Sequence, residues 1–178
     1  PYPDERSAEV MRRTVEFFEA KGLSKVKEDD RAAVWYRDFL EFARRERLFA
    51  TMCTPAGYGA PDCRWDTWRI CEFAEILGFY GLPYWYTWQV TILGLGPFWM
   101  SGNEAMKRRA AAILAEGGVF GFGLSEKEHG ADIYSTEMRL SKSPESGYHA
   151  RGRKYYIGNG NEAALLSVFG KAGEGDDW

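Results

Sequence analysis

The spacing of apolar residues changes part-way along the chain, and this change constrains the fold more than any other feature of the sequence. Before Gly117 apolar residues recur every three to four positions, the period of an amphipathic helix. After Val119 the period falls to about two, and Phe120, Phe122 and Leu124 alternate with glycines. The sequence therefore predicts a helical region followed by a β region, which is an α+β fold class.

The apolar spacing before Gly117 predicts five helices. Gly22 follows the first of them where a C-terminal cap belongs, Asp66 is a candidate N-cap, and Ser101 to Glu104 has capping-box spacing. One segment is apolar on nearly all sides, which predicts a helix buried inside the bundle. The predicted helices cover residues 7–20, 29 or 30 to about 47, 66 to about 77, 84–95, and 103–116, and the buried one is 84–95.

The second of these helices is predicted from a single apolar stripe. The stripe consists of Val34, Trp35, Phe39, Phe42 and Ala43.

Prolines and glycines then break the pattern between Thr54 and Cys63, where we expect an irregular loop. In the β region, residues 120–124, 148–157 and 163–170 read as antiparallel strands. Three or four strands with an unclosed edge are too few for a finished domain, so we expect the chain to be a fragment.

Composition excludes several classes of protein. The net charge of −3 gives no electrostatic footprint for nucleic acid or an anionic membrane. The nearly apolar run at residues 90–100 is about half the length that a bilayer-spanning helix needs. Three cysteines, an odd number with no C-x-x-C pair, argue against a disulfide framework and predict a reducing compartment such as the cytoplasm.

Familiar catalytic motifs are absent from the sequence. The glycines of 121–126 have spacing close to a dinucleotide fingerprint, but they lie within a strand pattern and no helix follows. No phosphate-binding P-loop sequence occurs. His129 and His149 have no second ligand at metal-binding spacing, and Ser125 lacks a nucleophile elbow.

Four segments in order nevertheless resemble one family. They are "TPAGYGAPD" at 54–62, "GNEAMKRRAAAILAEGG" at 102–118, "FGFGLSEKEHGAD" at 120–132 and "GYHARGRKYYIGNGNEA" at 147–163. The acyl-CoA dehydrogenase family has Pro-x-x-Tyr-Gly-Gly at the first of these places. At the third it has aromatic-x-aliphatic-Thr-Glu-Pro-x-x-Gly-Ser-Asp, and at the fourth Gly-x-Lys-x-Trp-Ile-Thr-Asn-Gly. The chain therefore resembles an acyl-CoA dehydrogenase.

This resemblance implies an N-terminal α-helical domain at residues 1–117. Residues 118–178 would then be the opening strands of a middle antiparallel β-barrel domain. The implied enzyme uses FAD to convert an acyl-CoA thioester to the trans-2-enoyl-CoA, and a carboxylate beyond Trp178 acts as base, so no catalytic residue is assigned here. An electron-transfer flavoprotein as acceptor and a homodimer or homotetramer are also implied.

The resemblance also assigns cofactor-binding positions. A strand through Phe122 and Leu124 would lie against the flavin ring, with Gly121 and Gly123 making room for it. The hydroxyl of Ser125 would bond the pyrimidine side of the flavin. The remaining positions are Gly130 and Ala131 at the pyrophosphate, with Ala131 also near the substrate, Tyr156 as an aromatic plate, Ile157, and Gly158.

Three departures from the family pattern leave the function open. Glu-Lys-Glu-His at 126–129 replaces Glu-Pro-x-x ahead of Gly130. Ala131 replaces a serine, and Gly158 replaces a threonine or serine whose hydroxyl reaches flavin N5 in the family. An acyl-CoA oxidase or a flavin monooxygenase on the same scaffold is one alternative. A non-catalytic subunit of a dehydrogenase complex is another.

Overall fold

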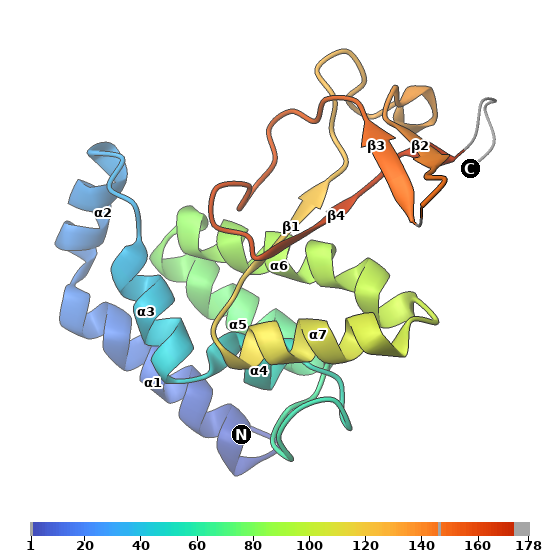
Figure 1. Cartoon of the computed structure of the whole chain (residues 1–178). Helices are drawn as coiled ribbons and strands as arrows, with labels where there is room; N and C mark the ends of the chain where they lie inside the picture. The colour runs from blue at the N-terminus through green and yellow to red at the C-terminus, as the bar shows by residue number, and fades with distance from the viewer. Residues whose placement is uncertain (1, 146, 173–178) are drawn as a thin grey trace.

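A computed structural model of the protein describes residues 2–145 and 147–172. A bundle of helices comes first along the chain, and a small β region lies against one side of it (Figure 1). This order confirms the α+β fold class. The helices are α1 (Glu5–Lys21), α2 (Leu23–Arg31), α3 (Arg37–Arg45), α4 (Leu48–Cys53), α5 (Thr67–Tyr80), α6 (Leu82–Met100) and α7 (Glu104–Ala115), with a short 3-10 helix at Ile133–Ser135. The strands are β1 (Phe120–Gly123), β2 (Arg139–Lys142), β3 (Tyr148–Arg151), β4 (Leu165–Val168) and β5 (Lys171–Ala172).

Capping residues account for several helix ends. The carboxylate of Asp66 accepts from the N–H of Arg69 at 3.0 Å, so the predicted N-cap of α5 is confirmed. Gly22 ends α1 with φ of 79°, as expected for a glycine cap. The capping box expected to start at Ser101 is wrong, because Asn103 is the N-cap of α7 and accepts from Met106 N at 3.1 Å.

The helix expected to run from residue 29 or 30 to about 47 is wrong at its start. Ala33 has a left-handed φ of 51°, which ends α2 before it. The N–H groups of Ala33 and Val34 donate to the carbonyls of Asp30 and Asp29 at 3.1 and 2.9 Å. Val34 and Trp35 are consequently exposed instead of lying in the core. The predicted apolar stripe lies in the core only from α3 onward, where Phe39, Phe42 and Ala43 are buried.

Two helices were not predicted, namely α4 and all but the last residues of α2. All six residues of α4, Leu48–Cys53, are buried, so they show no alternation between an apolar and a polar face. The irregular loop expected from Thr54 to Cys63 is confirmed, because no helix or strand is formed there.

Helix α6 forms the seam between the two parts of the molecule. It buries Trp88, whose ring lies 4.8 Å from that of Phe73 in an edge-on contact. The expected helix is confirmed, but its burial on all sides is not. Tyr86 and Leu93 are 45% and 43% exposed. Figure 1 shows β1 and β4 running over another part of the same helix.

The described strands pair in both directions. The hairpin β2–β3 is antiparallel as predicted, with Arg139 opposite Arg151. Strands β1 and β4 instead pair in parallel, with Phe120 opposite Leu165, and β2 and β5 also pair in parallel. The long connection between β1 and β4 returns the chain to the same end of the sheet, which permits this pairing. No closed barrel is formed by the described strands.

The strand expected at residues 148–157 ends early. β3 ends at Arg151, and the positive φ of 157° at Gly152 and of 54° at Tyr156 do not fit a continuing strand. Residues 173–178, where the sequence predicts the β part to end, lie outside the described residues. Among residues 2–145 and 147–172, no helix has the length and apolar character needed to cross a membrane. The same part of the chain contains no group of side chains suited to a metal ion.

Candidate functional site

Helix α6 and strand β1 approach each other so closely that one contact requires glycine. A Cβ atom at Gly94 would lie 2.6 Å from the carbonyl oxygen of Gly121. The hydroxyl of Ser167 on β4 donates to the carbonyl of Gly94 at 2.7 Å. The two parallel strands are therefore seated directly on the backbone of α6.

The buried side chain of Asn159 joins three segments. Its Nδ2 atom donates to the carbonyl of Thr87 at 3.1 Å and to the hydroxyl of Thr91 at 3.2 Å, both on α6. It also donates to the carbonyl of Phe120 on β1 at 2.9 Å. An amide carries only two N–H groups, so one of them is shared between acceptors. Asn159 thereby fixes the turn at residues 156–160 to both α6 and β1.

A buried ion pair fixes the segment after β1. Lys154 Nζ donates to Glu126 Oε1 at 2.8 Å, to the carbonyl of Leu124 at 2.9 Å and to the hydroxyl of Thr136 at 2.9 Å. The side chains of Lys154 and Glu126 are only 7% and 6% exposed. All three N–H bonds of the ammonium group therefore have acceptors inside the protein.

Glu126 accepts more hydrogen bonds than the lysine alone supplies. The N–H groups of Glu137 and Met138 donate to its two oxygens at 2.7 and 3.0 Å, and the Thr136 hydroxyl also donates to it. Burial by itself raises the pKa of Glu126. The Glu137 N–H, Lys154, Thr136 and the Met138 N–H outweigh burial and lower this pKa to about 2. Glu126 is therefore a charged, structural carboxylate.

Residues 120–125 and 154–159 lie side by side. The N–H of Tyr155 donates to the carbonyl of Ser125 at 2.9 Å, which adds a link to the Lys154 and Asn159 contacts. The predicted positions Phe122, Leu124 and Ser125 are thereby brought to the same region as Tyr156, Ile157 and Gly158. Their role in binding a cofactor stays a prediction.

Ser125 is partly buried and Tyr156 is exposed in this region. The Ser125 hydroxyl has no hydrogen-bond partner among the described residues, and the Tyr156 ring is 83% exposed. Gly130 and Ala131 lie apart from these groups in sequence, in an exposed turn. The expected reason for Gly121 is wrong, however, because a Cβ there would lie 2.3 Å from Leu166 Cδ2, so this glycine makes room for β4.

Two residues of α6 that shape the site, Tyr86 and Val90, were not predicted from the sequence. A Cβ at Gly158 would lie 2.7 Å from Tyr86 Cε1, 2.7 Å from Val90 Cγ2 and 2.9 Å from the Tyr86 hydroxyl. Side chains of α6 therefore occupy the space that a side chain at position 158 would need. The apolar spacing of α6 placed Tyr86 in a buried helix and gave no sign of this contact.

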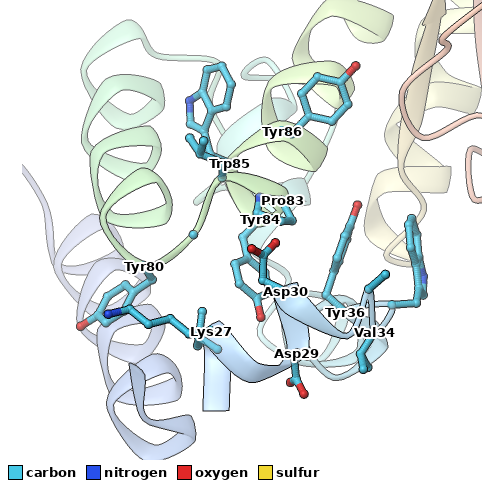
Figure 2. Close-up of a pocket in the computed structure, with 15 residues that line it drawn as sticks. Lys27, Asp29, Asp30, Val34, Tyr36, Tyr80, Pro83, Tyr84, Trp85 and Tyr86 are labelled. Atoms are coloured by element: carbon cyan, nitrogen blue, oxygen red, sulfur yellow. The ribbon is translucent and has the colours of Figure 1, made fainter. Parts of the chain in front are cut away.

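A cavity of about 750 Å³ lies beyond Tyr86, between the end of α2 and the start of α6 (Figure 2). Aromatic side chains, Tyr36, Tyr80 and Trp85 among them, form much of its lining. Asp30 and Lys27 add charge to it. The sequence did not indicate this cavity, because residues 34 and 35 were expected in a continuous helix.

The described residues have the fold of the N-terminal helical domain and first β strands of an acyl-CoA dehydrogenase. The butyryl-CoA dehydrogenase structure from Megasphaera elsdenii matches with a TM-score of 0.80 and 24% identity, over 94% of this chain and 44% of that one. An acyl-CoA dehydrogenase from Bacillus anthracis complexed with FAD matches with a TM-score of 0.77 and 19% identity, over 95% of this chain and 29% of that one.

Sequence comparison points the same way. The short-chain-specific acyl-CoA dehydrogenase of Megasphaera elsdenii is 35% identical over 74 residues, which make up 41% of this chain and 19% of that enzyme. No family model matches the sequence. The comparisons confirm the resemblance to acyl-CoA dehydrogenases, and the chain spans less than half the length of these relatives.

Proposed function

We propose that the full-length protein is an FAD-dependent acyl-CoA dehydrogenase and that this chain supplies its N-terminal helical domain and the first wall of its flavin site. The observation that carries the proposal is the alignment of residues 120–125 with 154–159, held by Lys154 and Asn159 and presenting the unpartnered Ser125 hydroxyl. The fold shared with acyl-CoA dehydrogenases and the sequence match to a short-chain-specific one support it. The domain division at residue 117 is part of the same proposal.

The residues of this chain would hold and orient the flavin. Backbone groups of Phe122 and Leu124 and the hydroxyl of Ser125 would face the ring, and Gly130 and Ala131 would contact the pyrophosphate. Tyr156, Ile157 and Gly158 would cover the adjoining edge, and Ala131 would also approach the substrate. The flavin held by these residues would supply the acceptor for a hydride from the β-carbon of the acyl thioester. The base that takes the α-proton is proposed to lie outside residues 1–178.

The partners follow from the same proposal. The substrate is an acyl-CoA thioester, and an electron-transfer flavoprotein would reoxidise the flavin. The homodimer or homotetramer and the cytoplasmic location remain predictions. Cys53 and Cys63 are buried free thiols and Cys71 is an exposed one, which accords with a reducing compartment.

The full-length protein is expected to purify yellow, with close to stoichiometric FAD. Flavin content is measured by absorbance after release of the cofactor, before and after incubation with added FAD. Protein that stays colourless and shows no flavin after reconstitution would contradict the proposal. FAD binding without any response to acyl-CoA would favour a non-catalytic subunit.

Replacing Ser125 by alanine is expected to weaken FAD retention by roughly two- to tenfold, because one hydrogen bond of about 0.5–1.5 kcal/mol to the flavin is lost. The dissociation constant of FAD for the full-length apoprotein is the measurement. Ser135→Ala, in an exposed stretch away from the strands, serves as the control. Equal FAD affinity and equal flavin potential in the Ser125 variant and the wild type would remove this residue from the site.

A further inference from the structure

The peptide group between Leu124 and Ser125 is hydrogen-bonded on one side only. Its carbonyl oxygen, on Leu124, accepts from Lys154 Nζ at 2.9 Å. Its N–H, on Ser125, has no hydrogen-bond partner among the described residues. The C=O and N–H of a trans peptide point in opposite directions, so this N–H faces away from the ammonium group. Ser125 therefore presents a free N–H on the side of the segment opposite Lys154.

The neighbouring backbone groups of this segment are used inside the protein. The Ser125 carbonyl accepts from the Tyr155 N–H at 2.9 Å, and the Glu126 N–H donates to the carbonyl of His129 at 3.4 Å. Two donors of Ser125 remain, its N–H and its hydroxyl. Because Ser125 is partly buried, these unused donors call for a ligand that carries acceptor atoms, such as the edge of the proposed flavin.

Lys154 also changes the strength of the free donor. A carbonyl that accepts from a charged group polarises its own peptide, which makes the N–H of that peptide a stronger donor. The side chain of Lys154 is only 7% exposed, so salt and water screen its charge little. Glu126 offsets only part of this effect, because its carboxylate is also held by the N–H groups of Glu137 and Met138 and makes no hydrogen bond to the polarised peptide.

We propose that Lys154 is a positioning residue of the flavin site, which directs the Ser125 N–H at the pyrimidine ring of the flavin and raises the reduction potential of the flavin. This inference rests on the proposed function, in which Ser125 lies beside that ring. Reduced flavin carries more negative charge on the pyrimidine ring than oxidised flavin, so a stronger donor there stabilises the reduced form more. A lysine that only held the fold together would affect the binding of the two forms equally.

The test measures the binding of oxidised FAD and, without oxygen, of reduced FAD to full-length apoprotein. The ratio of the two dissociation constants gives the shift in flavin potential and does not depend on turnover. Lys154→Met combined with Glu126→Gln removes both buried charges together. The affinity of this double variant for reduced FAD is expected to fall about three- to tenfold more than its affinity for oxidised FAD, which lowers the two-electron potential by about 15–30 mV. If melting shows this variant to be unfolded, Lys154→Gln with Glu126→Gln replaces it, with the same expected direction.

Glu126→Gln alone separates the two partners, since Lys154 and its bond to Leu124 remain. Its affinity ratio should stay at least as favourable to reduced FAD as that of the wild type. An equal fall in the single and double variants would assign the effect to the carboxylate and overturn the inference. Lys107→Met with Glu104→Gln removes an ion pair of 3.1 Å on α7 and is the matched control, for which the wild-type ratio is expected.

Adding Ser125→Ala shows which donor of Ser125 is involved. Alanine keeps the N–H and loses the hydroxyl, so the double change should shift the ratio equally with and without it. A shift that disappears in the alanine background would place the effect on the hydroxyl and overturn the inference. An unchanged ratio in the folded double variant would do the same while leaving the proposed function intact. Wild-type protein that binds FAD in neither form would refute the proposed function as well.

Discussion

Replacing Lys154 by methionine is expected to lower the free energy of unfolding by about 3–5 kcal/mol near neutral pH, because it leaves the buried Glu126 carboxylate without its counter-ion. The carbonyl of Leu124 would also lose its donor. Denaturant-induced unfolding of the full-length protein measures the change. Lys127→Met, at a highly exposed lysine close by in sequence, is the control and should have little effect.

The same ion pair gives a pH dependence with a definite sign. Glu126 has its pKa lowered from 4.5 to about 2 in the folded protein, so its contribution to stability is complete above about pH 4.5 and is lost as the pH falls toward 2. The contribution lost is about 3 kcal/mol. The destabilisation by Lys154→Met should shrink over this range as Glu126 becomes protonated. Adding Glu126→Gln to Lys154→Met should restore part of the stability at neutral pH, and a further loss instead would contradict this account.

Replacing Asn159 by alanine is expected to cost about 2–4 kcal/mol, because several buried acceptors lose their donor and alanine is disfavoured at a left-handed φ. Asn159→Gly separates the two effects, since glycine tolerates that backbone conformation. Melting temperature and denaturant midpoint are the measurements.

Asn161→Ala, two residues further along in an exposed position, is the control for Asn159. The Asn159 variants should also lose FAD affinity if the turn at residues 156–160 borders the flavin. Stability equal to that of the wild type in Asn159→Ala would show that the hydrogen bonds to Thr87, Thr91 and Phe120 do not fix this turn.

Sequence periodicity predicted the helices that are determined by their own local sequence. α1, α5 and α7 have side-chain caps or a terminal glycine beside a clear apolar spacing, and their approximate positions were correct. The segment at residues 32–36 failed because a left-handed Ala33 is a tertiary feature that spacing does not reveal. α4 was missed because burial on every side removes the alternation on which prediction depends. Parallel pairing of β1 with β4 also depends on long-range contacts.

Only the part of the site that lies within the family motifs could be predicted from the sequence. The resemblance placed Ser125 and Gly158 in one region, and the structure brings their segments together. The contact between Gly158 and Tyr86 joins residues 72 positions apart, and no pattern in a single sequence indicates such a pair. Gly121 was expected to face the flavin, but its missing side chain makes room for Leu166.

The most direct test of the central claim is anaerobic addition of butyryl-CoA to the full-length protein containing FAD. We expect the flavin absorbance to bleach within the time of mixing and the 2-enoyl-CoA to appear in an amount equal to the flavin reduced. Fast reoxidation of the reduced flavin by O₂ afterwards would identify an oxidase on this scaffold. A flavin that stays oxidised with butyryl-, octanoyl- and dodecanoyl-CoA alike would contradict the assignment as an acyl-CoA dehydrogenase.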